Sequence, residues 1–143
     1  MSTVENKAKV RRLSEMVNSG NLDGIVDLFD TSYVFHTTPE IRGAEEVKRM
    51  FSNMLHAFPD YEETIEHMVA EGELVAVFYT LRGTFKNVYG NMEPTGKRFT
   101  VSASVLARFR DGRQVEAWEY LDQLSWYQQM GIDLSKVPQL APV

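Results

Sequence analysis

The apolar residues of this chain change their spacing at Asp60, and this change constrains the fold more than any other feature. Before Asp60, apolar side chains recur every three or four positions, which is the period of an amphipathic helix. After it, long segments alternate apolar and polar side chains, which is typical of strands with one buried face. Helices followed by consecutive strands favour an antiparallel sheet with helices on one face. We therefore predict an α+β fold.

Three helices and one strand are predicted before that point. The first helix covers residues 3–20, the second is a short stretch after Asn21 that includes 25–29, and the third covers 43–58. The strand covers residues 31–38. Ser2 and Glu5 have the spacing of a capping box, which places the start of the first helix. The third helix has the clearest apolar stripe in the chain, and Pro59 ends it.

Four strands and a last helix are predicted after Asp60. The strands cover residues 61–70, 73–85, 97–110 and 113–122, with a loop over 86–96. Asp111-Gly112 is a strong signal for a two-residue hairpin between the last two strands. Strands of this length must twist and curl, so helices on the concave side should enclose a cavity. A helix over 124–130 and an extended tail over 132–143 complete one domain, 1–143, with its core at about 3–131.

Composition fits one globular domain and narrows the classes of function. The 143 residues carry a net charge of −5, whereas nucleic acids and anionic membranes usually require a basic face. The chain has no cysteine, which excludes disulfides and thiolate sites, and its three histidines lack the spacing of metal ligands. No apolar run approaches the ~18 residues of a membrane span, and no secretory signal is visible. We expect a cytoplasmic protein without a metal, a nucleic-acid partner or a membrane partner.

Four local patterns occur in the order and spacing of one known family. They are AFPDY at 57–61, AEGE at 70–73 leading to GT at 83–84, PTGK at 94–97, and RFRDG at 108–112 leading to QMG at 129–131. Together they resemble the SnoaL-like polyketide cyclases, or ester cyclases, over about residues 31–131. The resemblance implies the cone-shaped, cystatin-like fold of nuclear transport factor 2, with a single pocket between the long third helix and the curved sheet.

The resemblance also implies an enzyme that needs no cofactor. Characterised cyclases of this family close a polyketide ring by intramolecular aldol chemistry, with a pocket aspartate as acid/base, and Asp122 matches that position. The family often has a histidine directly after the Gly-Thr pair, whereas this chain has Phe85. This departure leads us to expect a more apolar pocket than in the cyclases.

Asp122 is the first catalytic candidate, and two roles are open for it. On a strand it shares one face with Trp118 and Tyr120. If that face is the inner one, burial raises the pKa of Asp122 toward neutrality, which suits a general base. Alternatively, Asp122 caps the helix that begins near Leu124, since aspartate is a good N-cap.

His36 is the second catalytic candidate, because its position resembles that of a pocket histidine in relatives. It could steady an enolate, although a lone histidine on a strand can also be structural. Trp118, Tyr120, Tyr79 and Arg108 are the candidates for lining the substrate pocket. Arg108 can instead pair with Glu116 across the hairpin.

Three functions remain open from the sequence: an enzyme acting on a small apolar carbonyl compound, a binding module with the same pocket, and an adaptor that uses the outer sheet face. We also expect a homodimer, because alternation places six apolar side chains on one face of a strand, too many to leave exposed. They are Phe99, Val101, Ala103, Val105, Ala107 and Phe109. If that row covers the helices instead, only the family resemblance supports the dimer.

Overall fold

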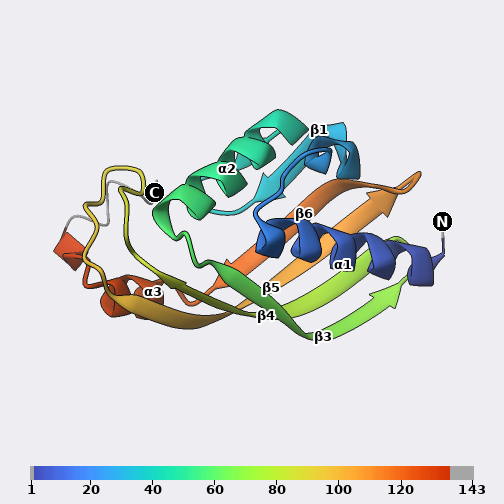
Figure 1. The fold of residues 1–143 in the computed structure, drawn as a ribbon. Coiled ribbons are helices and arrows are strands. Elements are labelled where there is room, and N and C mark those ends of the chain that lie inside the picture. The colour runs from blue at the N-terminus through green and yellow to red at the C-terminus, as the bar shows by residue number, and fades with distance from the viewer. Residues whose placement is uncertain (1, 136–143) are drawn as a thin grey trace.

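The computed structural model describes residues 2–135, and it folds into one curved sheet that carries two helices on its concave face (Figure 1). The helices are α1 (Thr3–Ser19), α2 (Ala44–Ala57) and α3 (Gln123–Met130), with a short 3-10 helix η1 (Ile25–Leu28). The strands are β1 (Phe29–His36), β2 (Ile41–Arg42), β3 (Glu62–Glu71), β4 (Leu74–Thr84), β5 (Arg98–Arg110) and β6 (Arg113–Leu121). The predicted α+β fold is confirmed.

Local signals account for the ends of α1. The side chain of Ser2 accepts a hydrogen bond of 3.1 Å from the backbone N–H of Glu5, as the predicted capping box requires. Gly20 ends the helix with φ 77°, a left-handed conformation that glycine adopts without steric cost. The predicted second helix is shorter than expected: it is the single turn η1, and Phe29 already begins β1.

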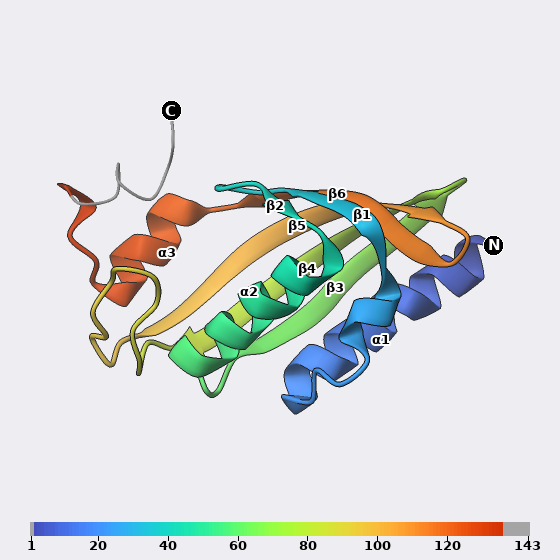
Figure 2. The ribbon, with the colours of Figure 1, turned by 90° about the horizontal axis from the view of Figure 1, so that it is seen from above.

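The strand order in the sheet is β2-β1-β6-β5-β4-β3. Most neighbours are antiparallel, but β1 and β6 run parallel, so the sheet is mixed rather than antiparallel throughout. No hairpin sets the relative direction of β1 and β6, because α2 and four strands separate them in the chain. The short strand β2, which pairs with β1, was not predicted from the sequence. Seen from above, α1 and α2 lie side by side over the sheet (Figure 2).

An aromatic cluster fills the core at the end of α2. Phe58 is fully buried, and its ring centre lies 5.0 Å from that of Phe99, 5.7 Å from that of Phe85 and 6.0 Å from that of Trp126. Phe85, the residue that departs from the family pattern, is therefore part of this core and does not line the pocket described below. Such edge-to-face contacts stabilise a core beyond the area that they bury.

The apolar row of β5 faces the helices. Phe99, Val101 and Phe109 are 3%, 5% and 2% exposed, and the other members of the row are buried or half-buried. Because this row covers the helices, it is not an exposed apolar face, and it does not support the homodimer that we expected from it. Among residues 2–135, no helix is long and apolar enough to cross a membrane.

The first prediction concerns the aromatic core. Phe58→Ala should lower the free energy of unfolding by about 3–5 kcal/mol, because the change leaves a cavity among packed rings. Met54→Ala, one turn earlier in α2, should cost less than about 2 kcal/mol, because Met54 is only half-buried and borders an existing cavity. Urea titration of both variants measures the difference, and equal losses would show that Phe58 has no special place in the core.

Candidate active site

A partly enclosed cavity of about 450 Å³ lies between the concave face of the sheet and the helices. Its volume falls in the range of small-molecule sites. All three α-helices and every strand contribute to its wall, which is mostly apolar. The large apolar side chains in the wall include Phe35, Phe51, Met54, Met92, Phe99 and Trp126. The pocket expected between α2 and the sheet is therefore present.

A β-bulge in β6 turns Glu119 toward this cavity. The pairing of β5 with β6 shifts by one residue between Phe109 and Arg108, which leaves Val115 without an opposite residue. One extra residue moves every later side chain of a strand to the other face. Beyond the bulge, Glu119 lies opposite Val105, and both residues line the cavity.

The Glu119 carboxyl group lies in a largely apolar environment. Its side chain is half-buried, because one side faces the cavity, and the hydroxyl of Thr37 donates a hydrogen bond of 3.1 Å to its Oε1. Burial raises the pKa of Glu119, the Thr37 hydrogen bond lowers it, and the charge of Glu63 raises it further. The net result is a carboxyl group that titrates above its usual range.

A second bulge, in β3, places Glu63 on the same inner face. The pairing of β3 with β4 shifts by one residue at Glu66. Without this shift, the register of the hairpin would set Glu63 opposite the exposed Arg82; with it, Glu63 lies opposite the buried Leu81. Glu63 and Glu119 are the two residues of the described cavity wall that carry a carboxyl group.

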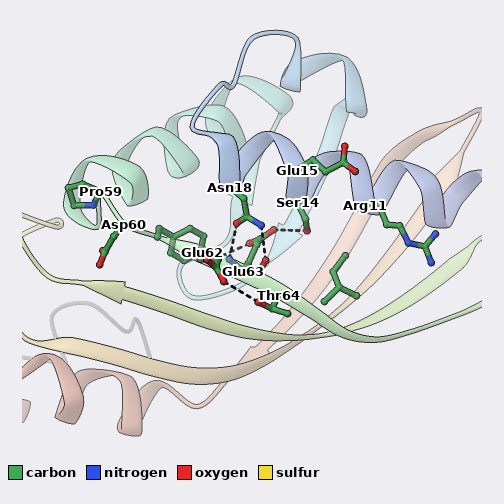
Figure 3. Close-up of a pocket in the computed structure, with 11 residues that line it drawn as sticks. Arg11, Ser14, Glu15, Asn18, Pro59, Asp60, Glu62, Glu63 and Thr64 are labelled. Atoms are coloured by element: carbon green, nitrogen blue, oxygen red, sulfur yellow. Dashed lines mark hydrogen bonds between the residues drawn. The ribbon is translucent and has the colours of Figure 1, made fainter.

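The Glu63 carboxyl group is held by two hydroxyl donors. It is 8% exposed, Ser14 donates a hydrogen bond of 2.8 Å to Oε1, and Tyr61 donates one of 3.0 Å to Oε2. The amide of Asn18 forms two more hydrogen bonds, with the backbone N–H and C=O of Glu63 (Figure 3). Burial raises the pKa of Glu63, while the bonds from Ser14 and Tyr61 lower it.

Buried tyrosines line the cavity together with the two carboxyl groups. Tyr33, Tyr61 and Tyr79 line the cavity, as predicted for Tyr79. Burial raises the pKa of all three, and it raises that of Tyr89 in the adjoining loop to about 12. These phenols therefore stay protonated at neutral pH and can donate hydrogen bonds to a ligand oxygen. Residues 2–135 contain no group of His, Asp or Glu side chains arranged to hold a metal ion.

Most of the chain matches the sequence model of one family, which is described as SnoaL-like polyketide cyclase and covers residues 7–130. The chain belongs to the SnoaL-like polyketide cyclase family. Aklanonic acid methyl ester cyclase DnrD from Streptomyces peucetius is 28% identical over 128 residues, which are 85% of this chain and 88% of DnrD.

Solved structures of this fold agree with that assignment. AclR from Streptomyces galilaeus, a candidate hydroxylase, superposes with a TM-score of 0.80 and 25% identity over 91% of this chain and 98% of its own. IdmH from Streptomyces antibioticus, a candidate polyketide cyclase, superposes with a TM-score of 0.73 and 28% sequence identity. The match covers 89% of this chain and 99% of IdmH. The family resemblance seen in the sequence is confirmed.

In this SnoaL-like protein, Asp122 lies outside the cavity. It is exposed at the start of α3, where its Oδ1 accepts a hydrogen bond of 3.1 Å from the backbone N–H of Ser125. This is the geometry of an N-cap, the alternative that the sequence left open. The expectation that Asp122 faces the pocket is wrong, because the bulge at Val115 turns its predicted strand neighbours to the outer face.

Three predicted pocket residues lie on that outer face. Tyr120 is 74% exposed, and Trp118 stacks on His36 with ring centres 5.3 Å apart. The guanidinium of Arg108 lies 5.8 Å from the centre of the Trp118 ring and 3.6 Å from the Glu116 carboxylate. Trp118, Tyr120 and Arg108 are therefore not pocket residues, and Arg108 makes the cross-strand pair given as its alternative.

His36 also faces outward, since its neighbour Phe35 points into the cavity. Its Nε2 lies 2.7 Å from Oε2 of Glu116, and its Nδ1 lies 2.9 Å from Oε2 of Glu40. The hydrogen bond to Glu116 is the main cause that raises the pKa of His36. The expectation that His36 acts inside the pocket is thus not met by its position.

Sequence reasoning missed both cavity glutamates. Glu63 had a local signal, because it alternates with Tyr61 and Ile65 and so interrupts an otherwise apolar face. Glu119 had none, because an unbroken hairpin across Asp111-Gly112 would direct it outward. Only the position of the bulge reverses that direction.

The second prediction concerns the pH dependence of the His36 contacts. The pKa of His36 is raised above 6.5, so its contribution to stability is present below that pH and is lost as pH rises through its folded pKa. His36→Gln should therefore lower the free energy of unfolding more at pH 6 than at pH 9, as measured by urea titration. The same change at the exposed His56 is the control. If His36→Gln lowered the free energy of unfolding equally at pH 6 and pH 9, this prediction would be contradicted.

Proposed function

We propose that this protein is a cofactor-independent cyclase that closes a ring in a mostly apolar carbonyl compound, with Glu119 exchanging the proton. The observation that carries the proposal is a carboxyl group of raised pKa inside a mostly apolar cavity that neutral phenols also line. Removal of a proton next to a carbonyl needs an acid/base that titrates near the working pH. The family supports the same class of reaction.

The tyrosines supply the second requirement of this chemistry. Abstraction of the proton leaves negative charge on the carbonyl oxygen, and donors aimed at that oxygen stabilise the enolate. Tyr33 and Tyr79 line the same cavity as Glu119, and burial keeps their hydroxyls protonated. Aromatic side chains in the wall, such as Phe99 and Trp126, favour a ligand with an aromatic ring system.

The third prediction tests Glu119. DnrD is named for its action on aklanonic acid methyl ester, so this compound is the first substrate to assay. Glu119→Gln should keep the bond from Thr37 but lower turnover by at least about 100-fold, the usual minimum for a lost acid/base. Its melting temperature at pH 8 should hold or rise, because a carboxyl group of raised pKa favours folding only when it is protonated.

Asp122→Asn is the matched control for this experiment. Asparagine caps a helix about as well as aspartate, so both turnover and stability should remain. Loss of turnover in Asp122→Asn, with turnover intact in Glu119→Gln, would return the acid/base role to Asp122. A wild-type protein that binds the ester without converting it would identify a binding module instead. Location in the cytoplasm remains an expectation from the sequence.

The fourth prediction concerns a homodimer, which we propose to form through the outer face of the sheet. Phe78 and Tyr120 are 49% and 74% exposed there, and both pair in register with Ser104. Such a patch is costly to leave in water. Sedimentation should give twice the 16.4 kDa of one chain, and Phe78→Lys should give monomers.

The matched control for the dimer is Val4→Lys, which places the same charge at an exposed apolar residue of α1, outside the sheet. This variant should remain dimeric. A wild-type protein that sediments as a single chain at micromolar concentration would contradict the proposal.

A further inference from the structure

We propose that Glu63 is a second catalytic carboxyl group: it is the base that removes the substrate proton, and Glu119 is the acid that protonates the new hydroxyl. This inference rests on the proposed function and divides its chemistry between two residues. Both side chains line the same cavity, from β3 and from β6. A carbonyl compound bound between them would meet one carboxyl group on each side.

The Glu63 carboxylate acts electrostatically on Glu119 across the cavity. The charge of Glu63 raises the pKa of Glu119, and the phenols of Tyr61 and Tyr79 respond to both carboxylates. Two negative charges in one apolar cavity are unfavourable, so one carboxyl group keeps its proton while the other ionises. This is the arrangement that separates a base from an acid.

Hydrogen bonds decide which of the two ionises first. Glu63 accepts from two hydroxyls, those of Ser14 and Tyr61, and each of these bonds favours the carboxylate. Glu119 accepts a hydrogen bond from one hydroxyl, that of Thr37, and the negative charge of Glu63 disfavours its ionisation. Glu63 is therefore the first of the two to ionise, which suits a base, and Glu119 keeps its proton to higher pH, which suits an acid.

The steps of the ring closure balance with these two groups alone. The Glu63 carboxylate takes a proton from the carbon next to a carbonyl, which leaves an enolate and a protonated Glu63. The enolate carbon forms a bond to a second carbonyl carbon of the same molecule, and the π bond of that carbonyl breaks. Its oxygen takes the proton of Glu119. The product is an isomer of the substrate, and the proton has moved from Glu119 to Glu63.

Before the next turnover Glu63 must lose this proton to water and Glu119 must take one up from water that enters the cavity as product leaves. Glu63 has a second route to solvent. A groove of about 580 Å³ runs along the outside of the molecule between α1 and the start of β3 (Figure 3). Glu63 and Tyr61 line both this groove and the cavity. Arg11, Glu15 and Asp60 belong to the groove wall. Glu63 can therefore exchange its proton with water on the groove side while product fills the cavity.

The test uses 2-tetralone, a small aromatic ketone with acidic C–H bonds next to its carbonyl. NMR in heavy water follows the replacement of these protons by deuterium, which requires a base, is assisted by a hydrogen-bond donor to the carbonyl oxygen, and involves no ring closure. The wild-type rate should rise with pH as Glu63 ionises and fall as Glu119 loses its proton. The titratable groups that face Glu63 are Tyr61, Tyr79 of β4 and Glu119 of β6, and the charged groups that share its groove are Arg11, Glu15, Asp60 and Glu62.

Glu63→Gln should lower the exchange rate by at least about 100-fold while circular dichroism shows a native fold. Glu119→Gln should remove the falling limb of the pH profile and keep the rising limb. Ser14→Ala removes one donor but leaves the carboxyl group, so it should keep the exchange and move the rising limb to higher pH. If Glu63 only anchored α1 to β3, Ser14→Ala would not shift the rising limb of the pH profile. This shift therefore tests the role of Glu63 even if the Glu63→Gln variant does not fold.

The outcomes separate this inference from the proposed function. If Glu119→Gln abolishes exchange while Glu63→Gln and Ser14→Ala leave the rate and profile unchanged, Glu63 is structural and only this inference is overturned. If neither glutamate variant changes the exchange, or if the wild-type protein shows none, the proposed function is overturned as well.

Discussion

Two single-residue bulges, at Glu66 in β3 and at Val115 in β6, determine which side chains face the cavity. Each bulge reverses the faces of the strand beyond it. Without them, Glu63 would lie beside Arg82 in solvent and Glu119 would point away from the core, and the side chains that now face outward from these parts of β3 and β6 would face the cavity instead. The chemical character of this site is thus set by the backbone register.

Placing two carboxyl groups inside an apolar cavity costs stability, because burial disfavours their charged forms. Hydrogen bonds from Ser14, Tyr61 and Thr37 offset part of this cost and fix the orientation of both groups. The packed rings around Phe58, at the end of α2, contribute to the stability that allows such a site. The core and the cavity wall therefore share two of these rings, Phe99 and Trp126.

Much of the fold could be predicted because its signals are local. The capping box at Ser2, the stripe of α2 and the hairpin at Asp111 each depend on residues close together in the chain, and each is found in the structure. The site could not be derived in the same way. Whether Glu119 or Asp122 faces the cavity depends on one unpaired residue, Val115. The packing of β5, β6 and α3 determines its position, and the alternation of apolar and polar residues in the sequence does not show it. The parallel pair of β1 and β6 was missed for a similar reason, since it joins distant segments.

The most direct test of this arrangement is a carboxyl ¹³C NMR titration of Glu63 and Glu119 in the free protein. Both groups should titrate above the ordinary glutamate value of 4.5, with Glu119 the higher of the two, and Glu63→Gln should lower the pKa of Glu119. If both carboxyl groups titrate near the ordinary value and neither responds to loss of the other, the two glutamates do not share one buried cavity.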